Sequence, residues 1–448
     1  MQIEITIATL IAVIVMILVA KKPKLFWPIL IVGNIVGNGP RLFGHIFWDE
    51  LITGAVILGT LVRIKISGKL LRGMNDRTGF FLVWVGYMVM ESIIGVIVND
   101  DLRIIKWILY YLMLGMLVCL TSKNGERFPF PSKRSLSVLV LITTVIYCSA
   151  YIMHGMIFEI LFGVPGLGRF MDQFMTEGFL WSGSAIAVFP MLLAMPVAIF
   201  AISDASRKVR ILAMVSILMM MTVAFYYDSR ISWVVIFSIL LASFRRIRFA
   251  KVVPIVLIFS TVFVFNMPAP REQVGEFFST IFETTQALWS PGEGDITRQL
   301  QFKAGFLRLS DNPKTFFIGD GIYSHRSTII PHMEELNRLY LPEQIFIQPG
   351  HKETYDDTLI FRTTAFTALI VDTGIIGMML LTLNFIFMAC RVVMSKTSDR
   401  IMYLTMILLA YMWLTVNNIS DVILLYLLNM PNGIIEQLSQ DSSAVVHS

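Results

Sequence analysis

Long apolar stretches recur along this chain of 448 residues, and they restrict its fold more than any other feature. A helix of about 20 apolar residues crosses the hydrocarbon core of a bilayer. The composition agrees, because 15% of the residues are charged, whereas soluble domains average about 25%. The stretches, with approximate ends, are 3–20, 25–40, 48–62, 79–98, 102–120, 135–154, 182–202, 211–227, 231–244, 252–267, 363–390 and 401–416. The sequence therefore predicts an all-α polytopic membrane helical bundle of about twelve transmembrane helices, with one large, partly helical loop on its outer face.

Positive charges gather in every second loop between these stretches. The first such loop contains Lys21, Lys22 and Lys24, and the last contains Arg391 and Lys396. Cytoplasmic loops of membrane proteins are enriched in Lys and Arg, so these loops are predicted to face the cytoplasm. The N-terminus and the remaining loops then lie outside. The net charge of +5 comes from cations that lie in these alternate loops. Membrane topology therefore explains the positive charge, and nucleic acid is not a predicted partner.

Residues 268–362 are far more polar than the rest of the chain. We expect about ten transmembrane helices in 1–267, an outer catalytic loop over 268–362, C-terminal transmembrane helices in 363–431 and a polar tail over 432–448. A loop this long in a compact protein is usually functional. Its spaced aromatic residues predict short helices on the membrane face, and Gly319 and Gly321 predict tight turns. It has no Cys/His spacing typical of a metal site and no phosphate-binding glycine loop, so no metal and no cofactor is predicted.

Three short motifs follow one another over residues 225–390. The first is YYDSRISW at 226–233, where one apolar stretch ends outside and the next begins. The second is DITR at 295–298, followed by FKAGFL at 302–307 and NPKTFFIGDG at 312–321. The third is DTGIIG at 372–377, which opens the apolar stretch after the polar loop. In order, spacing and topology these motifs resemble the O-antigen ligase and polysaccharide polymerase superfamily of bacterial envelopes.

The resemblance implies a multi-pass glycosyltransferase of the bacterial inner (cytoplasmic) membrane. Such an enzyme joins undecaprenyl-diphosphate-linked oligosaccharide repeat units on the outer leaflet, among membrane lipids and with a chain-length regulator protein as a partner. Ligases of the superfamily carry a His-Asn pair shortly before the acidic position of the third motif, where this chain has Thr363 and Thr364. This difference favours a polymerase over a ligase.

Arginines at the outer face suit a departing diphosphate, because guanidinium is planar, permanently charged and able to bind phosphate through two hydrogen bonds. The resemblance gives this role to Arg230 and Arg298, for which the alternatives are a lipid-facing anchor and a helix-surface charge, respectively. A sugar hydroxyl that attacks the anomeric carbon also needs a general base. The candidate bases are His325, His351 and Asp357. The candidate substrate-binding residues are Arg326, Arg362, Lys303 and Asp320.

Two other functions stay open from the sequence. One is a ligase that moves finished glycan to a lipid or protein acceptor, and the other is a transporter of lipid-linked oligosaccharide. Transporters place ionisable residues deep within their spans. Here Glu91 and Asp372 are the main acidic residues inside apolar stretches, and we interpret Glu91 as a structural contact between helices. An enzyme is therefore favoured over a transporter, and a scaffold protein of the envelope is a more distant alternative.

Overall fold

The computed structural model describes residues 2–37, 41–42, 46–64, 76–99, 104–123, 131–162, 188–204, 206–226, 230–243, 296–329, 331–332, 335, 365–394 and 400–416. Within these ranges the chain is almost entirely helical, apart from one pair of two-residue strands. Helices coincide with every predicted apolar stretch except 252–267, which lies outside the described residues. The predicted all-helical fold is therefore confirmed for the described part of the chain.

The N-terminal helices form one group. They are α1 (Gln2–Lys21), the 3-10 turn η1 (Pro23–Leu25), α2 (Phe26–Gly37), α3 (Trp48–Ile64), α4 (Asp76–Asn99) and α5 (Ile105–Lys123), with strands β1 (Arg41–Leu42) and β2 (Ile46–Phe47) between α2 and α3. Both α1 and α2 pack against α3, while α5 packs against α3 and α4. The two strands pair antiparallel and close the connection between α2 and α3.

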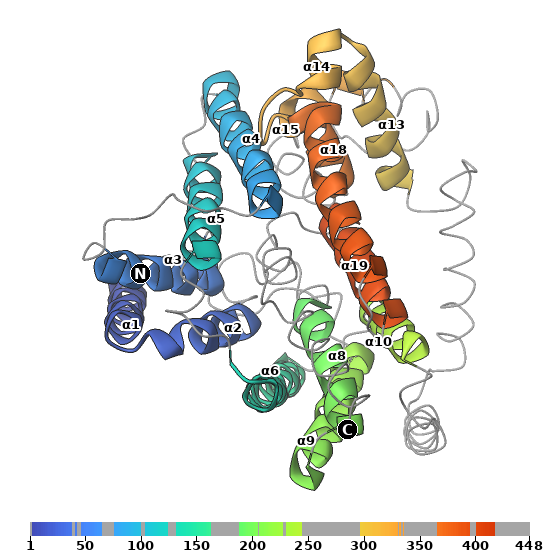
Figure 1. Ribbon diagram of the computed structural model, residues 1–448. Coiled ribbons are helices and arrows are strands. Elements are labelled where there is room, and N and C mark those ends of the chain that lie inside the picture. Colours follow the sequence, from blue (N-terminus) through green and yellow to red (C-terminus); the bar gives the residue numbers. More distant parts are fainter. Residues whose placement is uncertain are drawn as a thin grey trace.

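The remaining helices form a second group. They are α6 (Lys133–Phe162), α8 (Val188–Asp204), α9 (Arg207–Tyr226), α10 (Arg230–Ala242), α13 (Ile296–Ser310), α14 (Pro313–Phe317), α15 (His325–Thr328), α18 (Ala365–Met394) and α19 (Arg400–Val416). Helix α6 packs against α8 and α9 on one side and against α2 on the other, so it joins the groups (Figure 1). A second junction is the contact between α4 and α18.

Two of the helices are long and apolar enough to cross a membrane. They are Gly79–Asn99 within α4 and Phe366–Met394 within α18. Six more apolar helices are shorter, with 10–17 residues each in the described part. The larger number of spans expected from the sequence therefore stays a prediction, and so does the multi-pass location.

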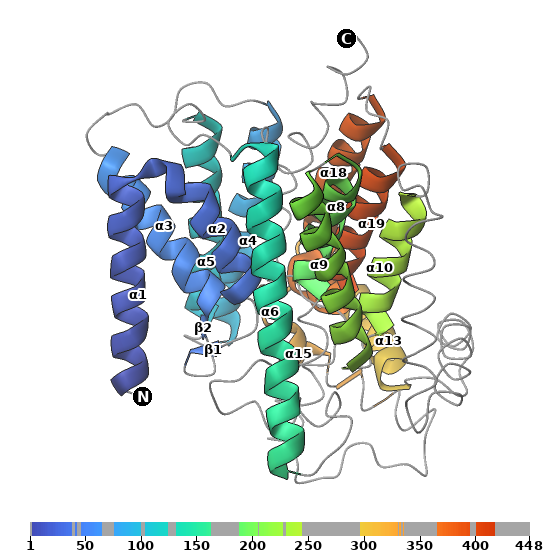
Figure 2. The same ribbon diagram turned by 90° about the horizontal axis from the view of Figure 1, so that it is seen from below.

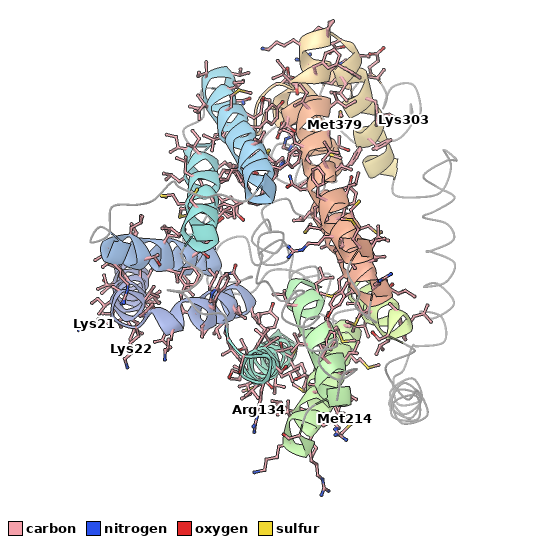
Figure 3. All side chains as sticks on the ribbon, viewed as in Figure 1. Lys21, Lys22, Arg134, Met214, Lys303 and Met379 are labelled. Carbon is pink, nitrogen blue, oxygen red and sulfur yellow. The ribbon has the colours of Figure 1, made fainter. Side chains whose placement is uncertain are left out.

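Large apolar side chains are exposed on many of these helices, among them Leu58, Ile97, Leu241 and Met394. Met394 keeps 75% of its surface exposed. Monomeric soluble proteins rarely expose apolar surface on this scale, because it is costly in water. The charged side chains of Lys21, Lys22 and Arg134 instead point outward from the helices (Figure 3). This distribution fits helices whose sides face an apolar medium.

The polar segment contributes short helices, as its sequence predicts. Helix α14 begins with Pro313, and the side chain of Asn312 caps it by accepting a hydrogen bond of 2.8 Å from the backbone N–H of Thr315. Both α13 and α14 pack against α18. Figure 2 shows α13 and α15 at the same end of the assembly as the N-terminus of α1. The described short helices of the polar segment thus pack against the N-terminal part of the long helix α18.

Candidate functional site

Helix α18 is broken near its start at Gly374. This glycine has φ 61° and ψ −171°, a conformation that residues with a Cβ rarely adopt. The break leaves carbonyl groups of α18 without partners inside the helix. The backbone N–H groups of Asp320 and Gly321 donate to the carbonyls of Val371 and Asp372, at 3.1 and 2.9 Å. A segment from the polar loop therefore replaces the missing turn of the helix.

This segment, residues 318–324, is called here the inserted loop, because it lies between α18 and α4. On the α4 side, the N–H of Ile322 donates to the carbonyl of Glu91 at 3.0 Å. The hydroxyl of Tyr87 donates to the carbonyls of Ile318 and Thr373, at 3.0 and 2.8 Å. Irregular backbone can lie between apolar helices only where its polar groups have protein partners. The hydrogen bonds from both helices meet that condition.

Glycines permit this close approach. Gly319 and Gly321 have φ values of 91° and 95°, so the predicted tight turns are present. A Cβ on Gly95 of α4 would collide with the backbone of Ile322. Asn99, one turn further along α4, donates from Nδ2 to the hydroxyl of Ser324 at 2.9 Å. The inserted loop therefore depends on small residues in both chain segments.

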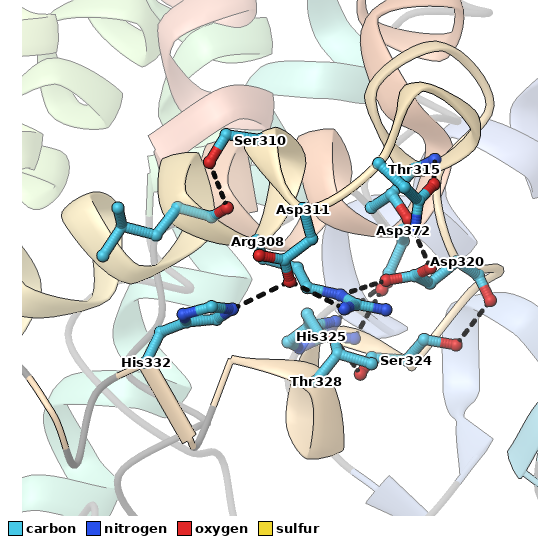
Figure 4. A network of polar contacts seen from close by, with 12 residues as sticks. Arg308, Ser310, Asp311, Thr315, Asp320, Ser324, His325, Thr328, His332 and Asp372 are labelled. Atoms are coloured by element: carbon cyan, nitrogen blue, oxygen red, sulfur yellow. Dashed lines mark hydrogen bonds and ion pairs between the residues drawn. The ribbon is translucent and has the colours of Figure 1, made fainter.

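The centre of the site is a buried pair, Asp372 and His325 (Figure 4). Oδ2 of Asp372 lies 2.9 Å from Nδ1 of His325 and accepts a second hydrogen bond of 2.8 Å from the N–H of Tyr323. Oδ1 accepts from the N–H of His325 at 2.8 Å. The two residues keep only 4% and 9% of their surface exposed. Asp372 thus holds both the imidazole ring and the backbone that carries it.

This geometry determines which ring nitrogen is available for chemistry. A carboxylate only accepts hydrogen bonds, so Nδ1 of His325 carries the hydrogen that points to Asp372. In the neutral ring, Nε2 then has the free lone pair. A carboxylate that orients an imidazole in this way is the recurring arrangement of a general base in enzymes. Of the three candidate bases, His325 is the one that the structure describes, whereas His351 and Asp357 lie outside the described residues.

A second polar network joins α13 to the inserted loop. Nε of Arg308 donates to Oδ2 of Asp320, and its Nη1 donates to Oδ2 of Asp311, both at 2.8 Å. Thr315 donates from its hydroxyl to Oδ1 of Asp320 at 3.0 Å. Nε2 of His332 lies 3.0 Å from Oδ2 of Asp311. Both carboxylate oxygens of Asp320, a candidate substrate-binding residue, therefore already have protein partners.

The network also changes two acid–base equilibria. Partial burial lowers the pKa of the Arg308 guanidinium, but its hydrogen bonds with Asp320 and Asp311 outweigh this effect and raise it. Burial opposes the charged form of Asp311, but hydrogen bonds with Arg308 and His332 dominate and lower the pKa of this carboxyl group. Both groups are therefore held in their charged forms.

The predicted arginines occupy different parts of the molecule. Arg230 begins α10, which packs against α8, α9 and α19. Arg298 lies in the first turn of α13, which packs against α14 and α18, and Arg326 lies in α15. Lys303 is partly buried on α13, and Figure 3 labels it there. Arg362 lies outside the described residues. The helices that carry Arg298 and Arg326 thus pack against α18, whereas the helix that carries Arg230 packs against α8, α9 and α19.

Two acidic residues of the site were not among the predicted site residues. Asp372 belongs to the third motif and, like Glu91, is an acidic residue inside an apolar stretch, and such a carboxylate is itself a signal of a buried partner. Glu91 is fully buried, and neither of its carboxylate oxygens has a hydrogen-bond partner among the described residues. Its backbone carbonyl, in contrast, holds the inserted loop. The interpretation of Glu91 as a structural contact therefore agrees with the hydrogen bond accepted by its backbone carbonyl, but it assigns no role to the carboxylate.

Within the described ranges, no group of three or more His, Cys, Asp and Glu side chains is placed to hold a metal ion. The chemistry available in this part of the chain is that of an oriented imidazole, carboxylates and cations. The chain matches no protein-family profile, no curated protein and no solved structure.

Proposed function

We propose that this protein is a multi-pass membrane glycosyltransferase that polymerises undecaprenyl-diphosphate-linked oligosaccharides on the outer leaflet of the bacterial inner membrane. The observation that carries the proposal is the Asp372–His325 pair, held between α4 and α18 at the end of the assembly covered by the polar segment. The exposed apolar side chains on the helices support a bundle of about twelve spans. The resemblance of the three motifs to those of bacterial polysaccharide polymerases supports the substrate class.

In this mechanism His325 activates the acceptor sugar. Nε2 takes the proton of an acceptor hydroxyl while that oxygen bonds to the anomeric carbon of the donor. The bond between the anomeric carbon and the diphosphate oxygen breaks, and the diphosphate leaves with the electron pair. Asp372 stabilises the resulting imidazolium through the contact at Nδ1. A positioned base of this kind contributes roughly 10²–10⁴-fold in rate.

The departing diphosphate needs positive charge. Arg298 and Arg326 lie on α13 and α15, the short helices that pack against α18 close to the Asp372–His325 pair. We propose that they bind the leaving group, with Lys303 on the same helix as a further cation and Arg230 and Arg362 as additional ligands. Guanidinium groups aimed at developing charge can supply several kcal/mol of transition-state stabilisation without a metal.

A ligase is the second candidate, and one observation favours keeping it. The chain lacks the His-Asn pair of the ligases, yet the structure brings a histidine from the polar loop to the same acidic position. An oriented base would serve transfer to a lipid or protein acceptor equally well. The transporter is less favoured, because the carbonyls opened by the break in α18 accept hydrogen bonds from Asp320, Gly321 and Tyr87. In transporters such carbonyls bind the coupling ion.

The test replaces His325→Gln and Arg298→Ala, with Arg63→Ala as the control. Arg63 is an arginine on α3 that donates to the carbonyl of Ala20, away from the site. The surface glycan of cells carrying each variant is resolved on a gel. We expect long-chain polymer to disappear in the first two variants and to persist in the control. Long chains of normal length in both site variants would refute the polymerase and the ligase together.

The same cells separate the two candidates. A polymerase variant accumulates single repeat units, whereas a ligase variant accumulates long polymer that is still attached to undecaprenyl diphosphate. Mass spectrometry of the extracted lipid-linked glycan reads this difference directly.

A further inference from the structure

A row of aromatic rings leads from α5 to the His325 ring. The ring centroids of Trp107 and Tyr323 are 6.1 Å apart, and those of Tyr323 and His325 are 6.2 Å apart. On the other side, Trp107 stacks on Tyr111 at 6.2 Å. The row thus connects the candidate base to rings from a helix more than 200 residues earlier in the chain, at the contact between the two groups of helices.

An aromatic belt at the membrane interface would be the simplest explanation of such rings. Belt residues, however, turn their rings toward lipid. Tyr111 is fully buried, Tyr110 nearly so, and Trp107 and Tyr323 are partly buried against the core. Trp107 and Tyr323 therefore pack against the core of the protein, while part of their surface stays exposed.

The backbone of Tyr323 adds a second, independent observation. Its φ is 75°, and it is the one described residue other than glycine with a positive φ. A side chain at such a position is strained relative to glycine, and such strain is concentrated at functional sites. Gly319 and Gly321 provide the turns of the same loop without this cost. The turn by itself would favour glycine at this position too, and the tyrosine adds a ring next to Trp107 and His325.

An ion pair lies beside Trp107. Nζ of Lys106 lies 3.3 Å from Oε1 of Glu50 and 5.7 Å from the centroid of the Trp107 ring. Sugars present an apolar C–H face and a rim of hydroxyls. Aromatic faces bind the first, and convergent polar groups bind the second. The row has this combination, with the ring of Tyr323 next to His325 and the charged pair next to Trp107.

We propose that Trp107 and Tyr323 form the acceptor-sugar subsite, against which the sugar ring whose hydroxyl faces His325 is stacked. The inference rests on the proposed function and specifies where its substrate binds. Lys106 and Glu50 bind hydroxyls at the edge of that ring. Trp107 and Tyr323 are binding residues here, and His325 alone takes the proton.

The experiment measures sugar binding without turnover. The probe is the delipidated oligosaccharide released by mild acid from the lipid-linked repeat unit of the host cell. The full-length protein is reconstituted in nanodiscs, and saturation-transfer NMR detects the ring C–H protons of the bound sugar. The variants are Trp107→Ala and Tyr323→Ala, with the ring-retaining Trp107→Phe and Tyr323→Phe as partial replacements. Phe387→Ala removes an exposed ring of α18 and serves as the control.

We expect both alanine variants to bind the oligosaccharide about tenfold more weakly, and the phenylalanine variants and the control to stay near the wild type. Wild-type affinity in both alanine variants, or no binding by the wild type, overturns the subsite. The phenylalanine variants keep the test decisive if an alanine variant does not fold. Each of them retains an aromatic ring, so a phenylalanine variant that no longer binds the oligosaccharide would also contradict stacking. If the oligosaccharide binds through the row but the protein makes no polymer from intact repeat units, the subsite stands and the polymerase fails.

Discussion

Two helix contacts in this protein are built in opposite ways. Where α6, α8 and α9 meet, the residues from Leu192 to Ala201 form an almost entirely buried apolar surface. The hydroxyls of Thr143, Thr144 and Thr222 donate to carbonyls of their own helices. Where α4 and α18 meet, hydrogen bonds donated by Tyr87 and accepted by Asp372 instead join segments that are far apart in the chain. The first contact is held by packing, with one added hydrogen bond of 3.2 Å from the hydroxyl of Ser216 on α9 to the carbonyl of Leu141 on α6. The second is held by several directional bonds.

The difference shows how a functional site is placed inside an apolar assembly. Helix packing tolerates changes in side chains as long as volume and polarity are conserved. A hydrogen bond between separate segments specifies position to a fraction of an ångström. The inserted loop interrupts α18, and the buried pair of Asp372 and His325 lies at that interruption. Substitutions at the α4–α18 contact should therefore have larger effects than matched substitutions elsewhere.

The largest expected effect is that of Asp372→Asn. The carboxylate of Asp372 accepts from the N–H of Tyr323, the N–H of His325 and Nδ1 of His325. In asparagine an NH₂ group replaces one of the two oxygens, and because NH₂ is also a donor it cannot accept these bonds. His325 then loses its orientation. We expect the polymerisation rate to fall by about 10²–10⁴-fold, measured with purified protein and lipid-linked repeat units. Asp311→Asn is the matched control, because this residue belongs to the neighbouring network and not to the pair. An Asp372→Asn enzyme with wild-type turnover would remove the catalytic role of the pair.

The next largest effect compares two glycines of the same helix. A Cβ on Gly95 meets the backbone of Ile322, whereas a Cβ on Gly86 meets no atom within 4 Å. Gly95→Ala should destabilise the protein by about 3 kcal/mol, because the inserted loop must move away. Gly86→Ala should be neutral or stabilise it by up to about 1 kcal/mol, because alanine favours a helix. Thermal unfolding in detergent measures both, and equal shifts would mean that the inserted loop is not tightly held against α4.

A smaller effect is expected from removing single hydroxyls. Tyr87→Phe takes away the donor that joins Ile318 and Thr373, so two buried carbonyls lose a partner. We expect a loss of about 1–2 kcal/mol in stability. Thr144→Val removes a hydroxyl that bonds only within α6, and its loss should be near zero because the helix keeps its own backbone bonds. Denaturation in mixed micelles compares the pair, and a larger loss for Thr144→Val would reverse the proposed contrast.

The smallest effect is a pH dependence. The contacts with Arg308 and His332 lower the pKa of Asp311 below its usual value near 4. The charged form is the one stabilised by folding, so this contribution is complete above the usual pKa and is lost as the pH falls through the lowered one. The α13 region should therefore loosen below about pH 4, with a modest amplitude because Asp311 is largely exposed to solvent. Hydrogen exchange of α13 measures this, and Asp311→Asn should make the region insensitive to pH in that range.

The positions of the helices could be predicted from sequence because each helix corresponds to a stretch of consecutive apolar residues, which can be recognised from local composition alone. The apolar stretches at 79–98 and 363–390 correspond closely to α4 and the main part of α18. The break at Gly374 was not predicted, because a glycine within an apolar stretch is compatible with a continuous helix. His325 was one of three candidate bases, and nothing near it in sequence distinguished it from the others.

The apolar pattern of this chain by itself determined that it folds into helices and that a polar segment separates α18 from the preceding ones. The tertiary structure alone decided that His325 meets Asp372, 47 residues away, and that Tyr323 meets Trp107. The physical reason is that the hydrophobic effect is non-directional and is readable from consecutive residues. The site depends instead on directional hydrogen bonds and on the positive φ of a few glycines, and these exist only once α4 and α18 are in contact.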